Sequence, residues 1–244
     1  MTIFALDASG KTSSVAILRD HKVIVESFID EGLTHSETLL TQVDKAFNTA
    51  QIIPKDIDYY TVTTGPGSFT GLRIGIATIK GLAFPLDTPC VAVSTLEAMA
   101  RDIEAAEDTV IVPVIDARRD RVYVAAYTMQ FHLEKATYKK ILDETILTLE
   151  QLKDITKGYL KPVMFVGEMW EKCYDYCKDT INCIPQPEGS GYIRGEIVAT
   201  IAEQKIAKKE YTSSSSLVPV YMQLSQAERE KLDGKVKKDD SISR

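Results

Sequence analysis

Residues 59–84 read YYTVTTGPGSFTGLRIGIATIKGLAF, and this stretch decides the fold. The β-branched and aromatic residues of 59–64 predict a buried strand, and the glycines and proline of 65–71 predict a tight loop. A helix should follow over 72–84, ended by the next proline. That helix carries only two charged residues and is apolar around most of its circumference, so it must be covered on more than one side.

The cover of this helix is either another part of the same domain or a second protein, and the residues leave both alternatives open. Gly71 and Gly75 lie four residues apart, and Thr78 continues the same small stripe. Small residues on one face would let another helix approach closely. The stretch therefore predicts an interface helix, with a central buried helix as the alternative.

Composition narrows the class of protein. The chain has 244 residues and a net charge of −6, which makes it a poor candidate for binding nucleic acid alone. No apolar run approaches the ~20 residues that would span a membrane. The first residues lack the basic start of a signal peptide, so the expected compartment is the cytoplasm.

Cysteine and histidine spacing offers no metal site. Cys173, Cys177 and Cys183 form a C-x3-C-x5-C pattern that does not match zinc ligands, and the three histidines lie far apart. In a cytosolic chain we expect the four cysteines to be reduced and mostly buried. No catalytic nucleophile with a base at motif spacing is present, so we predict no catalytic residue and no metal.

The order of predicted elements suggests a duplicated α/β unit. Three strands within 2–29 open the chain, followed by a helix, the 59–84 stretch, a short strand and a helix that starts at Thr95. A similar order of predicted strands and helices begins again at Val110. We therefore predict one half over 1–104 and a second over 105–212, with 217–232 returning to the first half and 233–244 disordered.

Two features could carry chemistry in the first half. Asp7 ends the first strand, where an acidic residue would suit phosphate and metal or simply hold an Asx-turn. Gly10-Lys11-Thr12 is no P-loop, because Ala5 stands where the pattern needs glycine. The loop before the apolar helix is a candidate anion or nucleotide site, through Gly67, Ser68 and Thr70, with tight-turn geometry as the alternative.

The second half contains one charged turn. Five of the six residues from Asp116 to Arg121 are charged, between two predicted strands. Paired arginines can bind phosphate or carboxylate, whereas a solvated hairpin tip is the plainer interpretation. His35 should cap or flank a helix start rather than act in catalysis.

The string GPGSFTGLRIG at 65–75, with His35-Ser36-Glu37 before it and Asp116-Ala117-Arg118-Arg119 after it, resembles the TsaB (YeaZ) family. Val218-Pro219-Val220-Tyr221 resembles the family's C-terminal segment. The chain departs from the family pattern at Met222-Gln223 and Asp120. The similarity is clear over 1–130 and looser beyond.

The resemblance implies an actin-like (ASKHA, ribonuclease H-like) α/β fold and a role in threonylcarbamoylation of the adenosine beside the anticodon, in tRNAs that read codons starting with A. It implies a noncatalytic scaffold or activator that pairs with TsaD and works with TsaE. A homodimer is implied when TsaD is absent, and tRNA is reached only through the complex. No cofactor of its own is implied, although ATP or ADP could sit at the complex interface.

TsaD carries a metal-binding histidine pair, and this chain has Thr95 and Met99 at the matching positions, so metal chemistry is not expected here. The alternative is a small actin-like ATPase or nucleotide-binding protein that acts alone through Asp7; a peptidase is disfavoured. The resemblance also implies that two helices form the pairing surface. Its candidate residues are Leu39, Val43, Phe47, Gly71, Leu72, Gly75, Thr78, Ile79 and Leu82.

Overall fold

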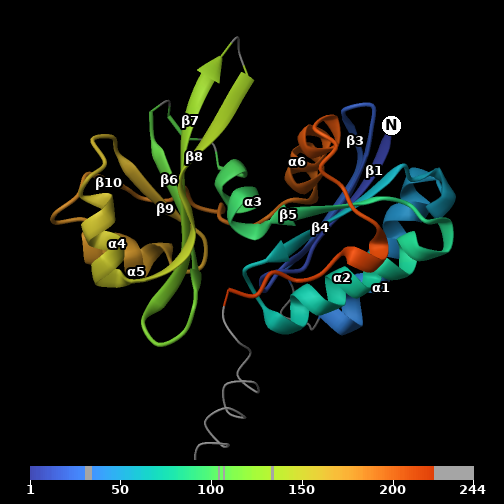
Figure 1. The fold of residues 1–244 in the computed structure, drawn as a ribbon, viewed down its shortest axis with the longest axis horizontal. Coiled ribbons are helices and arrows are strands. Elements are labelled where there is room, and N and C mark those ends of the chain that lie inside the picture. The colour runs from blue at the N-terminus through green and yellow to red at the C-terminus, as the bar shows by residue number, and fades with distance from the viewer. Residues whose placement is uncertain (31–34, 104, 107, 133–134, 223–244) are drawn as a thin grey trace, which may run out of the picture.

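The computed structural model describes residues 1–30, 35–103, 105–106, 108–132 and 135–222, of which residues 131, 132, 135 and 136 are described by their backbone alone. These residues form two α/β halves that lie side by side (Figure 1). Within them, no helix has the length and apolar character needed to cross a membrane.

The first half is built on a five-stranded sheet in the order β3-β2-β1-β4-β5. Three strands form an antiparallel meander, and the next two run parallel to the first. Parallel neighbours need crossover connections, and two helices supply them here. The strands are β1 (Thr2–Asp7), β2 (Ser13–Arg19), β3 (Lys22–Ile29), β4 (Tyr59–Gly65) and β5 (Cys90–Ser94), and the helices are α1 (His35–Ala50) and α2 (Phe69–Ala83).

The second half repeats this strand order. Its sheet runs β8-β7-β6-β9-β10, again an antiparallel meander followed by two parallel strands. The repetition confirms the prediction of two similar α/β halves. The elements are β6 (Val110–Asp116), β7 (Arg121–His132), β8 (Lys135–Thr148), α4 (Leu149–Thr156), β9 (Val163–Val166), α5 (Trp170–Cys177) and β10 (Cys183–Ile184).

Strand β1 shows why helices cover both faces of the first sheet. Its side chains alternate, so Phe4 and Leu6 join the core under α1 and α2, while Ile3 and Ala5 join the core on the opposite face. That opposite face is covered by α6 (Gly195–Ala207) (Figure 1). The sequence placed this helix in the range of the second half, whereas its contacts are with the first sheet.

One hydrophobic core joins the two halves. It contains residues of the first sheet and of α6 together with Ile111, Met164 and Val166 from the second sheet. The helix α3 (Thr95–Arg101) lies between the sheets and contributes Leu96 and Met99 to the same core. The halves are therefore not independent units joined by a linker.

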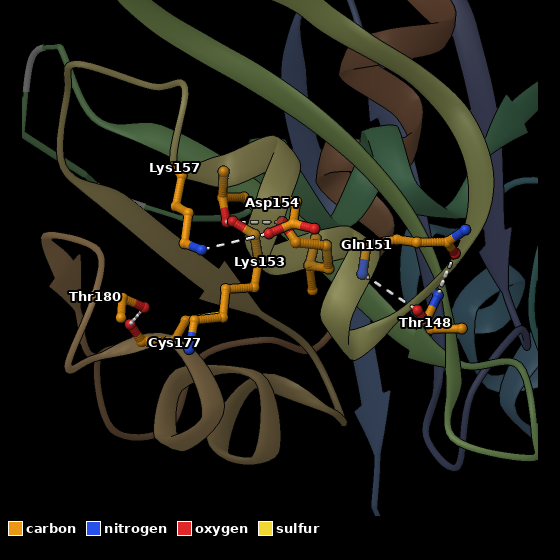
Figure 2. A network of polar contacts seen from close by, with 9 residues as sticks. Thr148, Gln151, Lys153, Asp154, Lys157, Cys177 and Thr180 are labelled. Carbon is orange, nitrogen blue, oxygen red and sulfur yellow. Dashed lines mark hydrogen bonds and ion pairs between the residues drawn. The ribbon is translucent and has the colours of Figure 1, made fainter.

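The outer face of the second sheet is closed by α4 and α5 (Figure 1), and Figure 2 shows polar side chains of these two helices and the residues next to them. Helix α4 begins with a capping box, in which the Gln151 backbone N–H donates to the Thr148 hydroxyl (3.2 Å) and the Thr148 N–H donates to the Gln151 side chain (2.9 Å). At the far end Lys157 pairs with Asp154 at 3.4 Å. After α5, the Thr180 hydroxyl donates to the Cys177 carbonyl oxygen at 3.1 Å.

After α6 the chain returns along the first half, as a segment that we call the strap (residues 211–222). Thr212 pairs with Cys90 at the edge of the sheet through two backbone hydrogen bonds of 2.8 Å. Further on, Lys80 of α2 donates to the carbonyl oxygens of Ser215 and Leu217. The strap thus runs along the first half up to Met222. The rest of the segment predicted to return, 223–232, and the predicted tail 233–244 lie outside the described residues.

Candidate functional site

Asp7 lies at the carboxyl end of β1 and is 1% exposed. Its Oδ1 accepts hydrogen bonds from the Ser9 backbone N–H (3.2 Å), the Ser9 hydroxyl (2.6 Å) and the Thr63 hydroxyl (2.5 Å). The bond to the N–H two residues later is the Asx-turn that the sequence offered as an alternative. Burial raises the pKa of the Asp7 carboxyl above its usual range, against the effect of the three hydrogen bonds.

The glycine loop packs against the turn that follows β1. The Ser68 N–H donates to the Ser9 carbonyl oxygen at 2.7 Å, and the Ser68 hydroxyl caps α2 by accepting from the Gly71 N–H at 3.1 Å. A Cβ at Gly67 would lie 2.3 Å from the Ser9 carbonyl oxygen, and one at Gly71 would lie 2.1 Å from that of Ala8. Close backbone packing therefore requires these two glycines, whereas the dihedral angles that the tight-turn alternative invoked require glycine only at Gly65 of this loop, where φ is 121°.

Asp7 and the glycine loop line one wall of a cleft of about 1300 Å³ between the halves. The first half contributes the turn after β1, the loop with Gly67, Ser68 and Thr70, and the side chains of Thr95 and Met99 from α3. The second half contributes the ends of β6 and β9, and the strap closes one side with Val220–Met222. Carboxyl ends of parallel strands meet here, as at ligand sites of other α/β proteins.

The charged turn lies at the mouth of this cleft. Arg118, Arg119 and Asp120 all have positive φ angles, of 65°, 56° and 54°. The turn is held by the Arg118 N–H donating to Asp116 (2.8 Å) and by an ion pair between Asp120 and Lys172 (2.8 Å). The Arg118 side chain is 81% exposed and borders the cleft. Two guanidinium groups are therefore presented to solvent from a strained turn.

The sequence missed a stack beside the glycine loop. The Arg73 guanidinium lies 3.7 Å from the centre of the Phe69 ring and donates to the Tyr221 hydroxyl at 2.8 Å. The Phe69 and Tyr221 rings stack with centroids 5.0 Å apart. This stack fastens the strap to α2. Arg73 and Tyr221 are separated by 148 residues, and no local pattern links them.

The expected interface residues point mostly inward. Gly75 faces the sheet, because a Cβ there would lie 3.0 Å from Leu6 Cδ2, and Gly71 faces the Ala8 backbone. The expectation that these glycines admit a second helix is wrong. Of the others, Leu39, Val43, Phe47, Leu72 and Ile79 are buried in the chain's own core, and Thr78 and Leu82 are half-buried.

The outward side of α2 carries a different small stripe, which we call the α2 ridge: Ile74, Ala77, Thr78 and Gly81. Ala77 and Gly81 are exposed, and Ile74 and Thr78 are half-buried. A Cβ at Gly81 would have no atom within 4 Å. Leu40 of α1 and Phe84 after α2 add exposed apolar side chains, at 67% and 72%. That α2 is an interface helix remains a prediction, and the α2 ridge is the face through which it would contact a partner.

Comparisons with known proteins agree with this architecture. The family described as "TsaD: tRNA N6-adenosine threonylcarbamoyltransferase" matches residues 32–232. The TsaB protein of Bacillus subtilis is 30% identical over 232 residues, which is 93% of this chain and 96% of the relative. That of Escherichia coli is 28% identical and covers 96% of this chain and 100% of its own length. A crystal structure from Pseudomonas aeruginosa, of "an uncharacterized protein with similarity to peptidase YEAZ", has 25% identity and a TM-score of 0.76, and covers 91% of this chain and 99% of that one.

A sheet order repeated in both halves around a central cleft defines an actin-like protein, here of the TsaD-like group. Within that group, the chain belongs to the TsaB (YeaZ) family.

An actin-like fold implies a nucleotide with a divalent cation, and the residues of the cleft fit such a cation poorly. One Asp7 oxygen already accepts three hydrogen bonds, and burial favours the uncharged carboxyl. Across the described ranges, no three His, Cys, Asp or Glu side chains are grouped to hold a metal. Met99 lines the cleft and packs against Gly167, where an added Cβ would lie 2.4 Å from the Met99 sulfur.

Proposed function

We propose that this chain is an accessory subunit of threonylcarbamoyladenosine biosynthesis, which pairs with TsaD and works with TsaE while TsaD performs the transfer to tRNA. Relatives across nearly the whole chain carry the name "tRNA threonylcarbamoyladenosine biosynthesis protein TsaB". Thr95 and Met99 replace the histidine pair that the resemblance implies for TsaD, and neither supplies a usual ligand for a metal ion of that kind. The net charge of −6 favours tRNA contact through the partner.

The observation that carries the pairing is the α2 ridge. Its four residues follow the i, i+3, i+4, i+7 spacing of one helix face, and two of them are Ala77 and Gly81. Small side chains allow two helix axes to approach to the near end of the usual 8–10 Å range. Exposed apolar side chains at Leu40 and Phe84 would then be covered. The same ridge would pair two copies of this chain when TsaD is absent.

The test uses Gly81, the ridge position at which an added Cβ would meet no other atom within 4 Å. Gly81→Arg adds a long charged side chain where nothing lies within 4 Å, so the fold is kept and helix propensity rises. Pairing should weaken by at least about tenfold, or about 1.4 kcal/mol, because a charge would be trapped between helices. Light scattering of the chain alone and mixed with TsaD from the same organism measures the loss.

Gly81→Ala is the matched control, since it changes the same residue but keeps the surface small; it should pair like the natural chain. Unchanged pairing of Gly81→Arg with both partners would exclude the α2 ridge. Failure of the natural chain to shift to a one-to-one complex, with TsaE and nucleotide present, would contradict the accessory role itself.

The cleft favours a second candidate, a nucleotide-binding protein that acts alone. It lies between the halves and is lined by Asp7 and by Gly67, Ser68 and Thr70. This candidate predicts nucleotide binding by the isolated chain and hydrolysis that Asp7→Ala abolishes. Calorimetric titration with ATP and a phosphate-release assay measure both, and absence of heat and of phosphate release would remove it.

A further inference from the structure

The chain crosses between its halves twice, once after α3 and once before α6. The first crossing leaves from Asp102, which follows α3 and donates its backbone N–H to Ala98. The second arrives at Arg194, the N-cap residue of α6. The Arg194 Nε donates to Asp102 Oδ1 at 2.7 Å, and the Asp102 side chain is only 6% exposed. One ion pair therefore joins the two crossings.

The Arg194 side of this pair is fixed to the first sheet. The next residue, Gly195, donates its N–H to the Ser14 hydroxyl at 2.6 Å, and a Cβ there would lie 2.7 Å from the Ala16 nitrogen. Helix α6 therefore begins in direct contact with β2. On its other side, Ile193 is buried in the core shared by the halves. Arg194 is the point at which the chain passes from the fixed helix to the second half.

Among the residues that the structure describes, three elements bring charged groups near Asp102: the start of α6, strand β3 and α3 itself. From α6, Arg194 also pairs with Glu196 (2.7 Å), whose N–H donates to Glu26 of β3 (3.0 Å). On α3 itself, Glu97 and Arg101 pair with each other, and Arg101 also donates to Gln204 of α6. Arg194 is thus the cation that pairs with Asp102, while Glu196 and, beyond it, Glu26 are anions on the Arg194 side of the pair.

We propose that Asp102 and Arg194 form a tie that holds the two crossings together and so sets the width of the cleft between the halves. Opening the cleft would turn the halves about these two crossings, and the tie resists their separation. Asp102 precedes β6, and the charged turn that follows β6 lies on the second-half wall of the cleft. Arg194 precedes α6, which packs on the first sheet, and that sheet carries the opposite wall. The tie concerns this chain alone and does not depend on the proposed pairing with TsaD.

The tie should respond to pH. Burial raises the pKa of Asp102 to about 6, although Arg194 opposes the rise. Above pH 6 the carboxylate is charged and forms an ion pair with Arg194; below it the carboxyl is neutral, and Glu196 is the anion that still pairs with Arg194. The raised pKa means that the folded protein binds a proton that the unfolded chain releases, so this group's contribution to stability falls as pH rises from 3.8 toward 6. The ion pair between charged Asp102 and Arg194 fixes the positions of the two crossings, but burying the carboxylate lowers the free energy of unfolding.

The experiment measures the distance across the cleft. Spin labels on unnatural residues introduced at Lys11 and Glu171, both exposed and on opposite walls, leave the four cysteines untouched. Labelled protein is diluted with unlabelled chain, and distance distributions are recorded at pH 7.5 and pH 5. The natural sequence should give a narrow distribution at pH 7.5 and a broader one at pH 5.

Asp102→Asn should be broad at both pH values while its melting temperature at pH 7.5 is unchanged or higher, a combination that a merely stabilising ion pair would not produce. Arg194→Gln should broaden the distribution in the same way. Asp175→Asn is the control, because it breaks an exposed pair with Lys178 inside the second half and should leave the distances unchanged. A narrow distribution in folded Asp102→Asn at pH 7.5, or a pH response that survives in that variant, would overturn the tie.

Discussion

At the scale of single residues, burial controls the chemistry of the thiols. Cys90, Cys173 and Cys177 are buried, and Cys183 is half-buried. Burial raises the pKa of the Cys173 thiol to about 12 and those of Cys90 and Cys177 to about 11. Since the thiolate is the reactive form, these side chains act as small apolar residues. The sequence predicted reduced and mostly buried cysteines from a spacing that does not match zinc ligands and from the expected cytosolic compartment.

We expect alkylation to follow exposure. With iodoacetamide at pH 8, Cys183 should react first, and the other three should react only once the chain is unfolded, because their thiolates are rare and shielded. Peptide mass spectrometry over a time course measures the order, and the same course in urea is the control. Labelling of Cys173 in native buffer as fast as Cys183 would contradict the packing described here.

At the scale of elements, α2 shows where sequence reasoning succeeds and where it stops. The strand, loop and helix of 59–84 were predictable, because β-branched residues, glycines and a terminal proline each favour one local conformation. The side of α2 that faces outward was not predictable, because a helix that is apolar around its whole circumference has no polar stripe to mark its exposed face. Gly71 and Gly75 therefore suggested a surface, although both face the chain's own β1 and its turn.

Two glycines of α2 should respond oppositely to the same substitution. Gly75→Ala should cost about 1 kcal/mol, since overpacking against Leu6, Ala8 and Val62 exceeds the gain in helix propensity. Gly81→Ala should gain up to about 1 kcal/mol, because its new methyl group meets nothing. Urea unfolding followed by circular dichroism measures both, and equal effects at the two positions would contradict the orientation of α2.

At the scale of the whole molecule, the shared core ties the halves into one folding unit. The duplicated layout was predictable from element order, and the repeated strand order confirms it. The return of 217–232 to the first half was a prediction, but the particular contacts of α6 with the first sheet and of the strap with α2 were not predictable, because they join residues more than a hundred positions apart. The cleft and its Arg73 stack depend on those same distant contacts.

We therefore expect one cooperative transition. Trp170, the single tryptophan, reports on the second half, while circular dichroism reports on all elements. Because Ile111 and Met164 pack into the same core as α6 and β1, the two signals should change at the same urea concentration. Midpoints that differ beyond error would mean that the halves unfold separately.

The left-handed turn Arg118–Asp120 has a consequence for protein engineering. Each of these residues occupies a backbone region in which glycine would be more stable by about 1 kcal/mol. A search for thermostable variants that scores only the free energy of unfolding would therefore replace both arginines with glycine. Such a protein would melt later and would have lost two exposed guanidinium groups, one of which borders the cleft, so stability screens of this chain need a functional readout at those positions.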